Sequence, residues 1–274
     1  MPAPKYSTNL SGVKVVIIGG SSGIGFAVAQ HLIEDGACVV LGSRTQAKID
    51  SAIARLSDGA VQYNADAERV RGWTVDVTGP EAETSLQAFF GKVGRFDHLV
   101  FTAGELLVAS LESATYDSIL HLCNLRLVSS ILAVKTAVYG GYIKDGGSIT
   151  LTSGSVYKDP MPNFAINAAV CGATVSFTRA LAYDLSPRNV RVNAVSPGPV
   201  QTELIASVPA AMIEQLQSKF LTARIGQPED LALSYVYFIK NPNVTGETLN
   251  NDSGSWASRP ELPAQSKRSA SPRW

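Results

Sequence analysis

The chain has 274 residues, 45% of them hydrophobic, which suffices for one large α/β domain with a substantial core. Its 23 basic and 23 acidic residues cancel, so no overall field draws the protein toward nucleic acid or an anionic membrane. We therefore expect a small-molecule substrate, and no nucleic-acid or membrane partner.

The first predicted element is a strand at residues 15–18, followed by a glycine-rich turn and a helical pattern at residues 26–33. The first backbone N–H groups of a helix have no partner within it, so a phosphate can bind there. We expect Gly19 to allow the tight turn, Gly23 to let a pyrophosphate approach, and Gly25 to let helix and strand pack closely. The predicted dinucleotide site here comprises Gly19, Ser21, Ser22, Gly23, Ile24 and Gly25.

The second predicted strand covers residues 37–41 and is followed by a turn that contains Ser43 and Arg44. An acidic residue at this point would bind the adenosine ribose hydroxyls and repel a phosphate. The sequence has no acid there, and the guanidinium of Arg44 suits a 2′-phosphate. The interpretation is NADP(H) rather than NAD(H); the alternative is an ordinary solvated arginine.

Two further strands, residues 71–77 and 98–101, end at Asp76-Val77 and just before Ala103-Gly104. Helical stretches follow each strand, and this alternation predicts a doubly wound parallel sheet of the Rossmann type with helices on both faces. Ligands bind such sheets at the carboxyl ends of the strands, which adds Asp76, Val77, Ala103 and Gly104 to the cofactor site. Asp76 alone could equally be a helix cap.

A long helix is predicted over residues 116–138, and Asn124 and Arg126 interrupt its apolar pattern. Within it, a shared face is expected for Leu120, Asn124, Leu127, Ile131 and Val134. A fifth strand, residues 147–153, ends at Ser153, and a helix over residues 164–185 leads to a sixth strand at 190–195.

The remainder is predicted to contain a helix over residues 203–224, another over 229–238 and a last strand over 247–251. The first of these helices either covers the substrate or simply packs on the core. The segment 257–274 is rich in Ser, Pro and basic residues, which predicts a disordered tail after a single domain over residues 1–256.

The cysteines and the first ten residues bear on metal binding and location. Cys38, Cys123 and Cys171 have no spacing typical of zinc or redox sites, so we expect reduced thiols and no metal. Residues 1–10 lack the apolar core of a signal peptide, and no apolar run is expected to reach the length of a membrane span. These patterns favour a cytoplasmic protein.

These motifs, in this order, resemble the short-chain dehydrogenase/reductase family. The match covers residues 10–256 and rests on the glycine turn, Asp76-Val77, Ala103-Gly104, Asn124, Ser153 and the segments 191–198 and 226–232. The resemblance implies a sheet of about seven strands, a nicotinamide cofactor, and a dimer or tetramer built on the two long helices. It also implies that Pro197, Gly198, Val200 and Thr202 contact the nicotinamide end of the cofactor.

The chain departs from the family at its catalytic pair. Family members have a tyrosine and, four residues later, a lysine; counting back from Asn193, these positions hold Asn167 and Cys171. A ketoreductase needs the tyrosine to give a proton to the developing alkoxide, and asparagine cannot do so near neutral pH. Tyr157 and Lys158 lie nearby but are adjacent to each other, so we do not favour them as replacements.

Hydride transfer to an iminium ion, or to an imine that has already taken up a proton, needs no such donor, because the product is a neutral amine. A carboxylate would stabilise the cation, and Asp159 supplies one, with Arg126, Ser153 and Asn124 as the other candidate catalytic residues. Asp159 could instead be a turn residue before proline, and Arg126 an interface residue. The pattern is similar to a fungal branch of the family, the reductase/Diels–Alder cyclases of bicyclic indole alkaloid pathways, which implies NADPH and an intramolecular [4+2] closure.

The missing pair also permits a second class of function, a non-catalytic NADP(H)-binding sensor or scaffold, or else a slow ketoreductase. Retention of Ser153, Asn124 and the segment 197–202 argues against a protein that binds only the adenine and phosphates. We prefer the enzyme.

Overall fold

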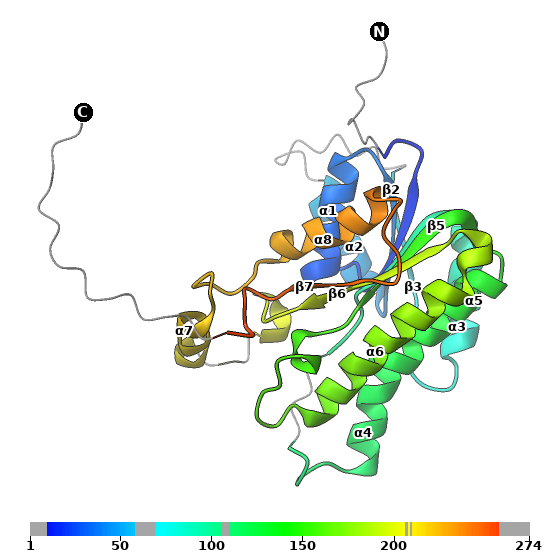
Figure 1. Cartoon of the computed structure of the whole chain (residues 1–274). Coiled ribbons are helices and arrows are strands. Elements are labelled where there is room, and N and C mark those ends of the chain that lie inside the picture. The colour runs from blue at the N-terminus through cyan, green and yellow to red at the C-terminus, as the bar shows by residue number, and fades with distance from the viewer. Residues whose placement is uncertain (1–9, 58–68, 106–109, 206–207, 209, 258–274) are drawn as a thin grey trace, which may run out of the picture.

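The computed structural model describes residues 10–57, 69–105, 110–205, 208 and 210–257 (Figure 1). The tail predicted over residues 257–274 therefore lies, beyond Ala257, outside the described residues. The strands are β1 (Lys14–Ile18), β2 (Cys38–Ser43), β3 (Val70–Thr74), β4 (Phe96–Phe101), β5 (Ile143–Thr152), β6 (Arg191–Pro197) and β7 (Thr248–Asn251). The α-helices are α1 (Gly23–Glu34), α2 (Gln46–Ser57), α3 (Ala82–Val93), α4 (Tyr116–Cys123), α5 (Ser129–Tyr139), α6 (Ala165–Asp184), α7 (Ala210–Lys219) and α8 (Pro228–Lys240).

The seven strands form one parallel sheet in the order β3-β2-β1-β4-β5-β6-β7. The chain starts at the middle of the sheet, builds one half outward to β3, and then returns to build the other half from β4. Parallel neighbours need crossovers, and the helices supply them. The predicted doubly wound Rossmann-type fold is confirmed.

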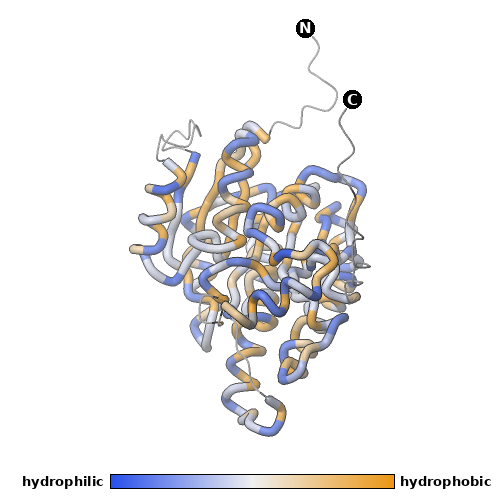
Figure 2. Tube along the Cα trace, turned by 90° about the vertical axis from the view of Figure 1, so that its left-hand side faces the viewer, coloured by the Kyte–Doolittle hydropathy of each residue, from blue (hydrophilic) through white to orange (hydrophobic). Residues whose placement is uncertain are grey.

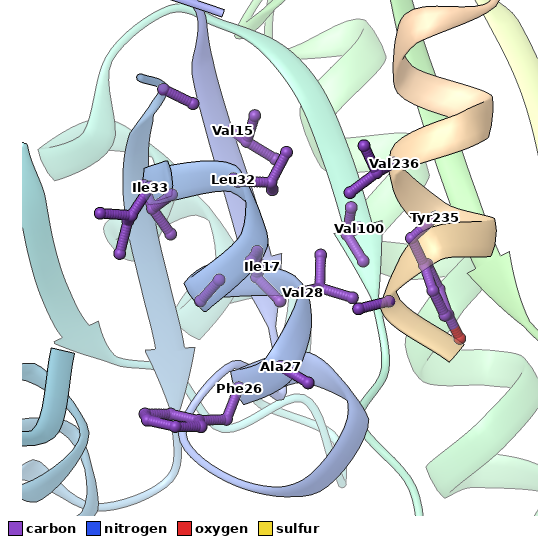
Figure 3. Packing of buried hydrophobic residues seen from close by; sticks show 14 of the residues in the cluster. Val15, Ile17, Phe26, Ala27, Val28, Leu32, Ile33, Val100, Tyr235 and Val236 are labelled. Atoms are coloured by element: carbon purple, nitrogen blue, oxygen red, sulfur yellow. The ribbon is translucent and has the colours of Figure 1, made fainter. Parts of the chain in front are cut away.

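Alternation along β1 shows why helices cover both faces of the sheet. Val15 and Ile17 point to one face and join a cluster with α1, α2 and α8, which Figure 3 shows around Val28, Leu32 and Tyr235. Val16 and Ile18 point to the opposite face, where α3, α5 and α6 pack. β1 is therefore buried on both sides, and Figure 2 shows the helices as alternating hydrophobic and hydrophilic stretches that suit this packing.

The predicted long helix is interrupted. Between α4 and α5 lies a π-helical turn, η1 (Asn124–Val128), in which the Ser129 N–H donates to the carbonyl of Asn124. One extra residue per turn changes the direction in which later side chains point. The predicted shared face is therefore wrong beyond the turn, where Ile131 is exposed while Val134 is buried. Leu120, which precedes the turn, is also exposed.

Several predicted boundaries also need correction. Strand β2 continues through Ser43, and β3 ends at Thr74, so Asp76 and Val77 lie in the loop beyond it. In place of one helix over residues 203–224, the structure has a short 3₁₀ turn, Glu203–Ile205, and α7, which ends at Lys219.

Two helical stretches, Tyr116–Tyr139 and Ala165–Asp184, are long and apolar enough to cross a membrane by length and composition. This corrects the expectation that no stretch reaches that length. In the structure, Ala133, Val134 and Ala137 of the first stretch and Ala182 of the second pack in the core beneath the sheet. About a third of each stretch is buried in this way, 33% of the first window and 28% of the second.

Candidate active site

The turn after β1 forms a cradle for an anion. Gly19 has a φ of +92°, and a Cβ there would lie 2.5 Å from the backbone nitrogen of Ala103. A Cβ on Gly25 would lie 2.3 Å from the Gly19 carbonyl oxygen, so close packing of α1 requires glycine, as predicted. Ser22 precedes α1 without a side-chain cap, and the first turn of α1 contains no acid, which leaves its N–H groups suited to a phosphate.

Gly23 lies beside the segment after β6. Its φ is +51°, and a Cβ there would be 3.2 Å from the Thr202 methyl group, so the structure brings the predicted cofactor residues of both segments together. Ile24 packs against the core cluster on the α1 face and is a structural neighbour of the site. Val200 is buried, and Gly198 lies against Asp252, where a Cβ would be 2.8 Å from its Cα atom.

The ends of β1, β2 and β3 supply the next group of residues. The Ser21 hydroxyl donates to the Ser43 hydroxyl at 2.9 Å. The Asp76 carboxylate accepts hydrogen bonds from Thr78, at 2.6 Å from the hydroxyl and 3.0 Å from the backbone N–H. These hydrogen bonds lower the pKa of Asp76, so its charge stabilises its own turn. Val77 is buried beneath that turn.

Arg44 has a partner that the sequence analysis missed. Its Nη2 atom lies 2.9 Å from Oε1 of Glu105, which follows Ala103-Gly104 after β4. The second carboxylate oxygen lies 3.5 Å from Nε2 of His121 on α4. A cavity of about 330 Å³ adjoins these groups and is lined by residues that include Thr78, Leu120 and Asn124. The position of Glu105 directly after Gly104 was the available signal, since it places an acid at the carboxyl edge of the sheet.

Arg126 extends from the π-helical turn toward Gly104. Its Nε and Nη2 atoms donate to the carbonyl of Glu105 at 3.3 and 2.9 Å. Both hydrogen bonds go to the backbone of Glu105, and among the described residues Arg126 forms no ion pair with Asp159. Asn124 begins the same turn and uses its carbonyl to accept the Ser129 N–H.

The two residues that the sequence analysis assigned to the family's catalytic positions are buried. Asn167 and Cys171 lie on α6 and are 5% and 3% exposed. The Ser153 hydroxyl donates to the carbonyl of Cys171 at 2.9 Å. Burial raises the pKa of the Cys171 thiol, and the positive charge of Arg126 only partly opposes this. The raised pKa favours the neutral form of this thiol.

Asp159 lies in the loop between β5 and α6, half-buried against the segment that follows β7. Its Oδ2 atom accepts a hydrogen bond from the Ser255 hydroxyl at 3.4 Å. Tyr157 donates to the Asn250 side chain at 3.3 Å, and the Lys158 ammonium lies 5.9 Å from the centre of the Trp256 ring. Tyr157 and Lys158 thus each contact a residue outside this loop, which does not favour them as a catalytic pair. Within the described ranges, no group of three or more His, Cys, Asp or Glu side chains could hold a metal ion.

A doubly wound parallel sheet with an anion cradle at its switch point defines a nucleotide-binding α/β protein. Residues 6–257 match the family model described as SDR-like rossmann domain. The chain belongs to the short-chain dehydrogenase/reductase family and is an oxidoreductase of the reductase type.

Relatives agree over nearly the whole chain. The protein is 32% identical to short-chain dehydrogenase/reductase ATR9 of Stachybotrys chlorohalonatus, over 90% of this chain and 98% of the relative. The solved structure of the MalC reductase/Diels-Alderase from Malbranchea aurantiaca superposes with a TM-score of 0.82 at 32% identity, covering 91% of this chain and 98% of that one. A short-chain dehydrogenase from Burkholderia cenocepacia in complex with NADP has a TM-score of 0.80 at 26% identity, covering 91% and 100%.

Proposed function

We propose that this protein is an NADP(H)-dependent reductase of a bulky, hydrophobic iminium- or imine-type intermediate of secondary metabolism. It would act in the cytoplasm as a homo-oligomer. The proposal is supported by the residue that we assign to the family's proton-donor position, which is an asparagine. Asn167 is buried, and the Ser153 hydroxyl is used in a hydrogen bond to Cys171.

The cofactor would be held along the carboxyl edge of the sheet. The α1 N-terminus would bind the pyrophosphate, and Arg44 the 2′-phosphate. The nicotinamide end would lie against Pro197, Gly198, Val200 and Thr202. When bound, the reduced nicotinamide supplies a hydride. The fit of the cradle and the NADP and NADPH complexes among similar structures support this assignment.

The substrate class follows from the chemistry that the side chains can provide. Reduction of a ketone leaves an alkoxide that needs a proton, and Asn167 cannot supply one. Reduction of an iminium ion leaves a neutral amine, so no proton donor is needed. The role of Asp159 would be to stabilise the cation before transfer. Arg126, Ser153 and Asn124 would shape the pocket by holding the Glu105 loop, α6 and the π-helical turn.

Similarity to MalC, which is named a reductase/Diels-Alderase, supports extending the proposal to a [4+2] cyclisation of the reduced product. Identifying the products by mass spectrometry and NMR, with and without protein, tests this step separately from the reduction.

The first test is a single-turnover experiment with NADPH and either a cyclic iminium ion or a ketone of the same skeleton. We expect nicotinamide absorbance to fall with the iminium and not with the ketone. Asp159→Asn should slow the reaction at least about tenfold, because it removes the charge opposite the cation. Asp145→Asn, which removes an exposed carboxylate paired with Arg188, is the control and should leave the rate unchanged.

Two results would overturn the proposal. Equal reduction of the ketone would favour a slow ketoreductase. Binding of NADPH without reduction of either compound would favour a sensor or scaffold.

A further inference from the structure

The carboxylate of Glu105 forms an ion pair with the guanidinium of Arg44, the group that the proposed function assigns to the 2′-phosphate. The Arg44–Glu105 pair has a 2.9 Å N–O distance, and its side chains are 56% and 39% exposed. The residues directly after β2 include no acid, but the fold brings Glu105, which follows β4, next to Arg44. A 2′-phosphate would need to displace this carboxylate from Arg44 and would then lie close to its negative charge.

We propose that Glu105 determines cofactor specificity by competing with the 2′-phosphate for Arg44, which narrows the preference for NADPH over NADH. This inference rests on the proposed function in its assignment of Arg44. An NADH molecule carries no 2′-phosphate, so it leaves the Arg44–Glu105 pair intact. Only the phosphorylated cofactor has to break it.

The surroundings of Glu105 allow its side chain to move while its backbone stays in place. Arg126 holds the Glu105 carbonyl with two hydrogen bonds, neither of which involves the carboxylate. The other carboxylate oxygen already lies 3.5 Å from Nε2 of His121, and the adjoining cavity has a volume of about 330 Å³. The carboxylate can therefore leave Arg44 and remain beside His121. Glu105→Gln changes the charge and retains the backbone anchor.

Isothermal titration of the full chain with NADPH and with NADH, at one ionic strength, tests the inference without relying on catalysis. We expect Glu105→Gln to tighten NADPH binding about three- to tenfold, the size of an exposed charge interaction, and to change NADH binding less than about twofold. In an Arg44→Gln background the same change should have no effect on NADPH. Asp145→Asn is the matched control, because it removes an exposed, arginine-paired carboxylate near the start of β5, and it should leave both affinities unchanged.

Four results would overturn the inference, and they separate it from the proposed function. If wild-type protein binds NADPH but Glu105→Gln does not change its affinity, competition is wrong and the cofactor assignment stands. An equal gain for NADH, or a gain that persists without Arg44, would also rule out competition for the guanidinium. If the wild-type protein binds neither nucleotide, both proposals fail.

Discussion

The imidazole of His98 lies within the sheet, on β4, with its Nδ1 atom 2.8 Å from the Ser148 hydroxyl on β5. Burial lowers its pKa to about 4, and the positive charge of Arg191 acts in the same direction. Asp97 opposes this effect, while Lys144 adds to it. His98 is therefore neutral in the folded protein at a pH where the unfolded chain would bind a proton.

This burial predicts a loss of stability on mild acidification. Because the folded-state pKa is lower than the unfolded one, the free energy of unfolding should fall as the pH drops from about 6.5 to about 4. The contribution is at most about 3 kcal/mol over this window. Urea unfolding at about pH 7.5 and about pH 4.5 measures it, and His98→Gln should reduce the difference between the two. An unchanged difference in the variant would contradict this account of His98.

For individual residues, the sequence predicted which side chains lie near the site but not which side chains they contact. Arg44 could be placed after a strand because a β-branched run precedes it, although that strand extends through Ser43. The acid that pairs with Arg44 comes from Glu105, 61 positions away, and only the crossover of the sheet brings the two together. Ser255, which donates to Asp159 across 96 positions, was missed for the same reason.

Among the elements, α1 shows how much the anion cradle depends on close packing. Gly25→Ala would place a methyl group 2.3 Å from the Gly19 carbonyl oxygen, a backbone atom that cannot move without opening the turn. We expect a loss of about 2–4 kcal/mol in the free energy of unfolding and loss of NADPH binding.

Gly172→Ala is the matched comparison, because a Cβ there meets nothing within 4 Å and the residue lies inside α6. That change should stabilise the protein slightly, by up to about 1 kcal/mol. Thermal unfolding of the two variants decides the point. Equal melting temperatures would show that the cradle tolerates a side chain at position 25.

Regular elements could be predicted because their hydrophobic periods are simple, and the exceptions have physical causes. The π-helical turn at Asn124–Val128 contains residues that are also common in α-helices, so the hydrophobic pattern of the sequence does not reveal its extra residue. It rotates Ile131 out to solvent and places Arg126 against Gly104. The helix expected over residues 203–224 is represented by a 3₁₀ turn and by α7, and Phe220, which is buried, lies just beyond the end of α7.

For the whole molecule, exposed apolar side chains gather on the two helical stretches that the family resemblance assigns to subunit contacts. They include Tyr116, Leu120, Val128, Ile131, Tyr139 and Tyr183. We predict that light scattering after size exclusion will show a dimer or tetramer. Ile131→Glu should shift it toward the monomer, because a charge would be buried at the contact. Ser51→Glu, on the exposed face of α2, should leave the assembly unchanged; a monomeric wild type would contradict the prediction.

The burial of Cys171 also limits its reactivity. Its side chain is 3% exposed, and burial raises the pKa of its thiol. Because electrophiles and oxidants attack the thiolate, Cys171 should resist both in the folded protein.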